Sequence, residues 1–292
     1  MDKDSAGKIE KRRRDGKARK TVPLFFLLAA ASALLVPGLS GPALQAGGDL
    51  RPRGPRVVAM AGSGTALPGS QDLNPALLVD ASRAAALSWT PSRFGLSELA
   101  DASAAWVQPF NNVLTARLSL QHTGFEAYRE LRAEVAAGLH AAPRLRVGCA
   151  AALQHVSMAR HGTAVAWGVD IAALLELAED LRCAAVAENA LQLPFAADER
   201  LPVRLRIGLG WETGALRIAV DVEKESRFAL ATRLGVEYAF EDCLFLRMGV
   251  GGAPSEGTAG FALRTRGLEI GYAVAVHPDL GWTHTAGIGF QP

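Results

Sequence analysis

Hydrophobic and polar residues alternate along most of the chain from residue 84 onward. In the last stretch, Trp282, His284, Ala286, Ile288 and Phe290 share one parity, and glycine and threonine residues fill most of the other. Because a strand presents successive side chains to opposite faces, each stretch predicts a strand with an apolar face and a polar face. We expect strands over residues 84–90, 101–109, 114–121, 130–139, 145–154, 164–171, 181–189, 203–211, 216–223, 233–238, 243–250, 261–264, 268–274 and 281–290.

The charged residues of these strands fall on the parity opposite the large apolar side chains. At mid-depth in a bilayer, an Arg or Lys facing lipid costs roughly 2–4 kcal/mol, whereas a lumen lets Arg and Glu pair across strands. The pattern therefore favours an all-β fold, a single antiparallel transmembrane β-barrel of about 14 strands with a short N-terminal plug-like segment. The alternative is a soluble periplasmic β-sandwich with a solvated charged face. Candidates for lining the lumen are Arg204, Arg206, Arg233, Glu237, Arg247 and Glu269.

The connections between the predicted strands fit hairpins. Glu241 and Asp242, Glu212 to Gly214, and Arg264 to Gly267 form short turns, while residues 191–200 and 251–257 form longer breaks. No apolar run after residue 46 is long enough for a membrane-spanning helix. Short turns on one side and longer loops on the other are typical of outer-membrane barrels.

The N-terminal residues have the pattern of a secretory signal. A basic stretch within residues 1–20 precedes an uncharged apolar run over residues 22–36, which is short for a transmembrane helix. We expect a signal peptide over residues 1–46 with cleavage near Ala43 or Ala46. An uncleaved anchor is the alternative. Residues 47–80 are then an N-terminal segment that enters or caps the barrel, and residues 81–290 are the barrel itself.

Charge and candidate chemistry indicate neither nucleic-acid binding nor catalysis. The net charge is +2, and the basic excess lies mostly within the first twenty residues, so no basic footprint for nucleic acid remains. Cys149, Cys183 and Cys243 show no metal-binding spacing and are expected to pack as small apolar residues, and the six histidines are scattered. Ser119, Ser157 and His155 offer catalytic residue types without a recognisable arrangement. We therefore expect no enzyme activity, no catalytic residue, no metal and no cofactor.

Several short motifs carry a family resemblance. They are Asn74-Pro75-Ala76, Leu201-Pro202-Val203-Arg204, Gly235-Val236-Glu237-Tyr238, Leu246-Arg247-Met248-Gly249, and Leu280-Gly281-Trp282-Thr283-His284 before the final Phe290. In order and spacing the chain resembles the PorV/PorQ-type outer-membrane proteins, relatives of the FadL-like barrels. The resemblance implies that Asn74 and Pro75 belong to a plug segment. The closing strand supplies the barrel-closure signal, with Trp282, Ile288 and Phe290 as candidates. Gln291 and Pro292 depart from the pattern because they follow the terminal aromatic residue.

Two functions follow from these expectations. The first is passage of a small hydrophobic solute through a plugged lumen. The second, implied by the resemblance, is a docking or shuttle platform in a type IX-like protein secretion system. Both place the chain in the outer membrane of a Gram-negative-type bacterium. The expected partners are outer-membrane lipid, the barrel insertion machinery, and either a hydrophobic solute or exported proteins.

Overall fold

The computed structural model describes residues 54–111, 113–193, 201–252 and 255–292. The predicted signal peptide over residues 1–46, with its candidate cleavage points Ala43 and Ala46, lies outside these ranges. All described residues belong to one unit, Gly41–Pro292.

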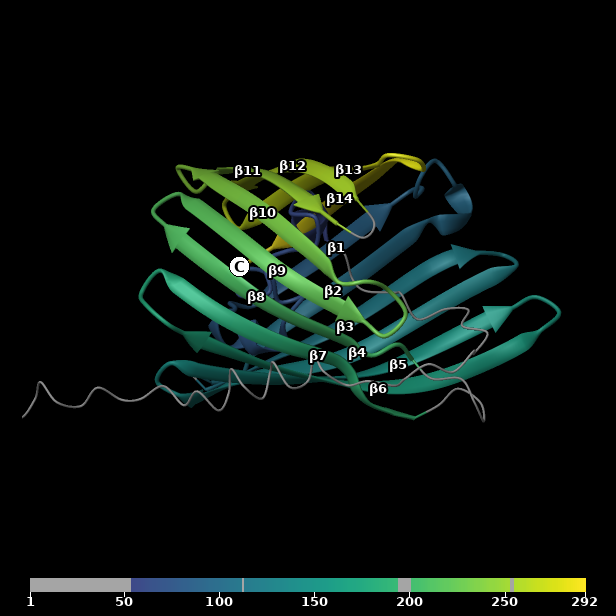
Figure 1. Ribbon diagram of the computed structural model, residues 1–292, viewed down its shortest axis with the longest axis horizontal. Coiled ribbons are helices and arrows are strands. Elements are labelled where there is room, and N and C mark those ends of the chain that lie inside the picture. Colours follow the sequence, from purple (N-terminus) through teal and green to yellow (C-terminus); the bar gives the residue numbers. More distant parts are fainter. Residues whose placement is uncertain (1–53, 112, 194–200, 253–254) are drawn as a thin grey trace, which may run out of the picture. The chain divides into compact units, whose positions relative to one another are not determined.

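Fourteen antiparallel strands close into a barrel (Figure 1). Each strand pairs with its neighbours in sequence, and β1 pairs with β14 to complete the circle, from Ala85 opposite Phe290 to Trp89 opposite Ala286. The predicted fold class and strand number are confirmed. The strands are β1 (Ala84–Thr90), β2 (Asp101–Pro109), β3 (Leu114–Phe125), β4 (Tyr128–Ala142), β5 (Leu145–Met158), β6 (Gly162–Glu176), β7 (Leu181–Leu193), β8 (Arg204–Thr213), β9 (Leu216–Glu225), β10 (Ala231–Phe240), β11 (Leu244–Gly251), β12 (Glu256–Thr265), β13 (Leu268–His277) and β14 (Gly281–Phe290).

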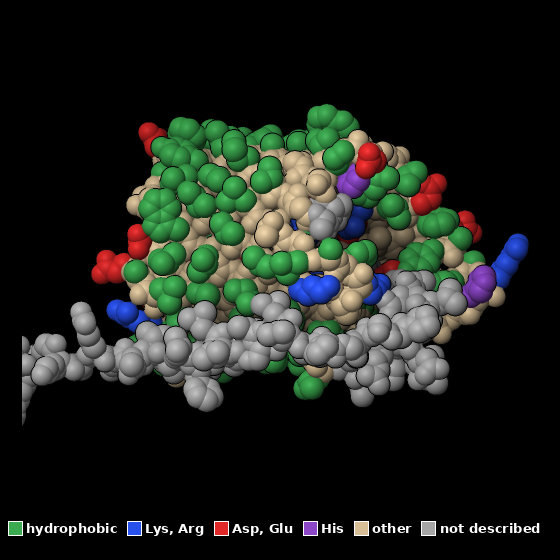
Figure 2. All heavy atoms as spheres, viewed as in Figure 1, with side chains coloured by type: hydrophobic (Ala, Val, Ile, Leu, Met, Phe, Trp, Pro, Cys, Tyr) green, Lys and Arg blue, Asp and Glu red, His purple; other side chains and the backbone are tan. Residues whose placement is uncertain are grey.

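The alternation along each strand sorts side chains between the outside and the lumen. On β3, for example, Leu118 and Leu120 are exposed on the outer face, while Arg117, Ser119 and Gln121 are buried inside. Figure 2 shows hydrophobic side chains spread over the wall between the two ends of the barrel. A closed barrel leaves no unpaired strand edge, so its outer face can be apolar while all strand hydrogen bonds stay within the wall.

The two ends of the barrel differ in their connections. We call the end that holds Phe290 the turn end, and its connections are the short segments 110–113, 143–144, 177–180, 214–215, 241–243 and 266–267. At the opposite end, the loop end, lie residues 91–100 with the helical turn η2 (Ser97–Leu99), and there β7 ends at Leu193 and β8 begins at Arg204. The β3–β4 and β5–β6 hairpins also project at the loop end (Figure 1, right). The predicted break at 191–200 begins later than expected, because β7 continues to Leu193.

Residues 54–83, here called the N-terminal segment, pack against the lumen side of the wall. The segment begins with the short helix α3 (Pro55–Ala59), which contacts β11 to β14, and continues to the 3-10 helix η1 (Pro75–Asp80), which contacts β3 to β6. It thus crosses the lumen between opposite sectors of the wall. Its apolar residues Ala66, Ala76 and Leu77 form a buried cluster with Leu174 and Val186 of the wall. No helix in the described ranges is long and apolar enough to cross a membrane.

Candidate functional site

The six predicted lumen residues all lie on the inner face of the wall, in two separate groups. Arg204, Arg206 and Arg233 lie toward the loop end, and Glu237, Arg247 and Glu269 lie toward the turn end. Arg233 and Glu269 are partly buried, and the other four are buried. Each of the six is paired with a residue of opposite charge. Positive and negative charges therefore balance one another on this part of the lumen face.

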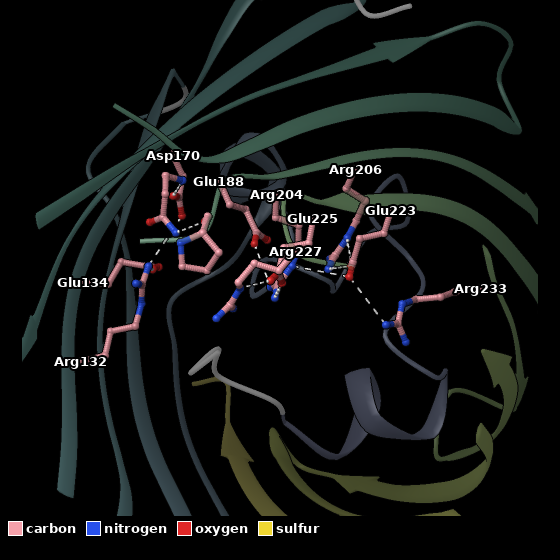
Figure 3. A network of polar contacts seen from close by, with 12 residues as sticks. Arg132, Glu134, Asp170, Glu188, Arg204, Arg206, Glu223, Glu225, Arg227 and Arg233 are labelled. Atoms are coloured by element: carbon pink, nitrogen blue, oxygen red, sulfur yellow. Dashed lines mark hydrogen bonds and ion pairs between the residues drawn. The ribbon is translucent and has the colours of Figure 1, made fainter. Parts of the chain in front are cut away.

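The loop-end group is a compact cluster of arginines and carboxylates (Figure 3). Arg206 Nη2 lies 2.5 Å from Glu223 Oε2, and Arg233 Nη2 lies 3.7 Å from Glu223 Oε1. Arg204 contacts Glu225 at 2.6 Å and Glu188 at 3.1 Å. Carboxylates on neighbouring strands therefore hold these guanidinium groups in position, and Arg204 is bound from both sides, by Glu188 of β7 and Glu225 of β9.

The turn-end group belongs to a longer chain of alternating charges that we call the ion-pair belt. Its contacts include Arg182 to Glu212 at 2.9 Å and Arg217 to Glu237 at 2.7 Å. In order, the belt runs through Asp80, Arg146, Glu176, Arg182, Glu212, Arg217, Glu237, Arg247, Glu269 and Arg264. The N-terminal segment joins it at two points, because Arg56 pairs with Glu237 at 2.8 Å and Asp80 pairs with Arg146 at 2.9 Å.

The N-terminal segment approaches the wall at a series of lumen-facing glycines. At Gly148 of β5, an added Cβ atom would lie less than 3.0 Å from the backbone of Pro75 and Ala76. At Gly249 of β11, it would lie less than 3.0 Å from the backbone of Met60 and Ala61. Comparably close approaches to the segment occur at Gly138, Gly208, Gly210, Gly235, Gly260 and Gly287. These strand glycines are therefore explained by the close approach of the N-terminal segment.

Buried hydrogen bonds fix the segment along this track. Asp221 of β9 is fully buried, and its Oδ2 accepts from the amide nitrogens of Gly64 and Thr65 at 3.1 and 3.0 Å and from the Thr65 hydroxyl at 2.6 Å. Asn74 is also buried. It caps η1 by accepting from the amide nitrogen of Ala76 and donates to the Thr65 carbonyl, each at 2.8 Å. The two predicted plug residues, Asn74 and Pro75, are thus buried at the start of η1.

Removal of the Asp221 carboxylate should loosen the segment. In Asp221→Ala, the amide groups of Gly64 and Thr65 lose their acceptor, and an unsatisfied buried polar group costs about 1–3 kcal/mol. We expect faster proteolysis within residues 54–83 and a lower temperature at which the folded barrel converts to its heat-denatured form on a gel. Asp221→Asn keeps an acceptor oxygen and should lie between the two. Equal protease resistance of the alanine variant and the wild type would contradict this anchoring role.

One sector of the lumen wall carries small, uncharged side chains instead of ion pairs. We call it the small-residue sector. Neither β14 nor β1 contains an acidic residue, Lys or Arg, and on β2 the one charged residue, Asp101, lies at the loop end. The inner face of the sector includes Ala86, Ser88, Ser103, Ala105, Gly287 and Gly289.

Two lumen cavities and one external groove lie around the segment. The outer cavity, of about 100 Å³, is at the loop end and is lined by the arginine cluster, Thr283 and Thr285. The inner cavity, of about 130 Å³, lies against the small-residue sector, and Asp72 lines both cavities. On the outside of the same sector is an apolar groove of about 450 Å³. The inner cavity and the external groove share Ala86, Leu87, Ala105, Ile288 and Gly289.

Other residues singled out in the sequence lie on the outside of the barrel. Trp282, Ile288 and Phe290 are exposed on the outer face of β14. Cys149 and Cys243 are also exposed, which corrects the expectation that all the cysteines are packing residues. Cys149 points outward from β5, and Cys243 lies in a turn. No group of His, Cys, Asp or Glu side chains in the described part of the chain is arranged to hold a metal ion.

Sequence reasoning missed the groups that hold the N-terminal segment. Asp72 of the segment pairs with Arg117 of β3, and Arg117 also contacts Glu134 at 2.5 Å. Neither Arg117 nor Asp221 was among the predicted lumen residues, although both have the lumen parity. The signal that could have located the segment is the recurrence of glycine on that parity in strand after strand.

Comparisons with known proteins identify the fold. No family model matches the sequence, and no curated protein matches it either. A TodX deltaS2S3 mutant described as a monoaromatic hydrocarbon channel superposes with a TM-score of 0.64 at 13% identity, covering 83% of this chain and 99% of that one. The Ralstonia pickettii toluene transporter TbuX has a TM-score of 0.62 at 14% identity, with 83% and 98% covered. A Pseudomonas aeruginosa FadL homologue has a TM-score of 0.61 at 10% identity, with 84% and 100% covered. The chain therefore has the barrel fold of the FadL-type proteins.

Proposed function

We propose that this chain is an outer-membrane β-barrel that passes a small hydrophobic solute, with residues 54–83 as its plug. The observation that carries the proposal is the small-residue sector. It is the part of the wall where the inner cavity, whose other lining includes Arg56, Asp72, Arg247 and Glu269, meets small uncharged side chains with an apolar groove directly outside them. A solute in the inner cavity is thus separated from the outside of the barrel by one thickness of the wall, where Ala86, Leu87, Ala105, Ile288 and Gly289 line both spaces.

Passage straight along the barrel axis is unfavourable for an apolar solute. The N-terminal segment crosses the lumen, and the ion-pair belt lines the turn end from β5 to β13, where Glu237 is almost fully buried. A solute that displaced water or partner groups from these charges without replacing their hydrogen bonds would lose several kcal/mol. The small-residue sector has no ion pairs to break, so we infer that the solute leaves sideways into the membrane where the hydrogen-bonded strands β1 and β14 separate.

The class of solute is proposed from size and from the structural neighbours. The inner cavity of about 130 Å³ suits a molecule of roughly one aromatic ring, since a cavity of about 150 Å³ lined by apolar side chains binds benzene. Among the neighbours, one structure is described as a monoaromatic hydrocarbon channel and another as a toluene transporter. Both observations support a small aromatic hydrocarbon.

The orientation follows from the connections. Outer-membrane barrels have short periplasmic turns and longer external loops. We therefore place the turn end, with Phe290, toward the periplasm and the loop end toward the cell surface. In this orientation the outer face contacts lipid, and Trp282, Ile288 and Phe290 are presented to the insertion machinery on the last strand.

The alternative function, a docking platform for protein secretion, receives no support from the structural comparisons. The PorV/PorQ resemblance of the sequence motifs stays a prediction. Pull-down of exported proteins that share a C-terminal domain is the measurement that would revive it.

The proposed function is tested by solute uptake in intact Gram-negative cells. Cells are required because an apolar solute dissolves directly in simple phospholipid vesicles. We expect cells that produce the protein to take up a radiolabelled monoaromatic hydrocarbon faster than cells with an empty vector. Membrane fractionation and heat-modifiable migration on a gel show that the folded barrel is in the outer membrane. Equal uptake despite a correctly inserted barrel would contradict the proposal.

A further inference from the structure

The connection between β1 and β2 contains a tight turn that places an aromatic ring at the loop-end mouth. Arg93 and Leu96 form a bridge, with Arg93 N to Leu96 O at 3.2 Å and Leu96 N to Arg93 O at 2.9 Å. The two residues between them, Phe94 and Gly95, have φ values of 55° and 80°. Positive φ at both central positions defines a type I′ turn.

Phenylalanine is an unfavourable residue at the first central position of such a turn. The left-handed conformation is natural for Asn, Asp and Gly, and bulky side chains rarely adopt it. Strained residues of this kind persist where the surrounding structure holds them in place and are concentrated at functional sites. Phe94 is therefore a candidate for a role beyond turn formation.

The surroundings of Phe94 hold the turn across the mouth of the barrel. Its amide nitrogen donates to Thr283 Oγ1 of β14 at 3.1 Å, and its ring meets the His277 ring edge-on at 5.9 Å. Arg93 reaches Asp101 of β2 at 3.5 Å. The turn thus connects the β1–β2 side of the mouth with the β13–β14 side.

The ring of Phe94 lies between the outer cavity and the surrounding solvent. It lines the cavity, and 36% of its surface is exposed. Most of the wall contribution to this cavity is charged or hydroxylated, and Phe94 is the only aromatic residue that lines it within the described ranges. An apolar molecule that enters this cavity from the loop end therefore finds one aromatic contact among mostly charged and hydroxylated groups.

We propose that Phe94 is the entry residue for the solute, an aromatic side chain that selects apolar molecules at the mouth and restricts polar ones. The proposal rests on the proposed function, because it assigns a role within the same path. Contact with an aromatic face or edge favours a flat apolar solute.

The decisive variant is Phe94→Asn. Asparagine suits the left-handed backbone, so the turn forms with less strain while the ring is absent. We expect the temperature of heat-induced unfolding to stay equal or rise, and uptake of a monoaromatic hydrocarbon to fall several-fold. Phe94→Trp keeps an aromatic ring on the same backbone and should retain most of the uptake.

A matched control uses the same turn chemistry at the other end of the barrel. Arg266 and Gly267, in the β12–β13 turn, have φ values of 47° and 82°, and they lie far along the wall from the mouth. Arg266→Asn relieves the same kind of backbone strain without touching the outer cavity. We expect unchanged uptake in this variant.

A second measurement reports on access without relying on transport. Thr285 lines the outer cavity and is buried, so Thr285→Cys places a thiol beneath the ring. A polar, membrane-impermeant maleimide added outside the cells should label this thiol slowly. When Phe94→Asn is combined with Thr285→Cys, labelling should become faster. Cys149, Cys183 and Cys243 are replaced by serine in both proteins so that the signal is specific.

The outcomes separate the two proposals. Reduced uptake in Phe94→Asn with faster labelling supports the entry role. Wild-type uptake in Phe94→Asn, or labelling at an unchanged rate, overturns it and leaves the proposed function intact. If the inserted wild-type barrel itself gives no uptake above empty cells, the proposed function fails, and the entry role fails with it.

Discussion

Gly148→Val should convert the closed barrel into one that conducts ions. At Gly148, the first atom of any side chain would lie less than 3.0 Å from the backbone of Pro75 and Ala76. Backbone atoms cannot move aside as a flexible side chain can, so η1 must move away from β5 and lose its packing there. Overpacking of this kind typically costs about 1–3 kcal/mol. The packing of the segment against the wall is weakened by this amount of free energy. Water then enters the space that η1 and Leu78 occupied.

Single-channel recording in planar bilayers measures this effect. We expect the wild type to be closed to ions and Gly148→Val to show openings. The control is Gly289→Ala on β14, because a Cβ atom there meets its nearest neighbours at ordinary distances of 3.8 and 3.9 Å. If Gly148→Val folds, as judged by heat-modifiable migration, and stays as closed as the wild type, then the segment does not seal the lumen through its contact with β5.

Ala86→Phe should block solute exit. Ala86 faces the lumen in the small-residue sector and lines both the inner cavity and the external groove. A benzyl group at this position fills much of a cavity of about 130 Å³. If the lost space costs the solute about 1.4 kcal/mol, its occupancy of the cavity falls about tenfold, and uptake falls with it. We expect the variant to insert and fold normally, because the position is exposed rather than packed.

The measurement is hydrocarbon uptake at equal amounts of inserted protein. Val165→Phe is the matched control, since Val165 is exposed on the outer face of β6, away from the groove. It adds the same ring to the barrel without filling the cavity. Wild-type uptake in Ala86→Phe would show that the solute does not use the small-residue sector.

The sequence predicted the barrel well because its signal is local. Parity alone distinguishes Leu118 and Leu120 from Arg117 and Ser119, and the same rule holds around the wall. Closure, with β1 paired to β14, requires contact between residues about two hundred positions apart, and only the membrane interpretation of the pattern pointed to it.

The site was less accessible to sequence reasoning. Parity placed Arg204 and Glu237 on the lumen face, but it could not show that they belong to different groups, one near the outer cavity and one in the ion-pair belt. The N-terminal segment was expected at the barrel, but its partners were not, because the contact between Asp221 and Thr65 depends on how a strandless segment winds through the lumen. The strain at Phe94 is a backbone property that no side-chain pattern reveals.

Selectivity of entry tests the central claim most directly. The initial rates of entry of toluene and of a small sugar are measured in the same cells, with and without the protein in the outer membrane. The proposed path predicts faster entry of toluene and an unchanged rate for the sugar, because the segment and the ion-pair belt close the axial route while the small-residue sector admits an apolar solute. Faster entry of both solutes, as through an open pore, or of neither, would contradict it.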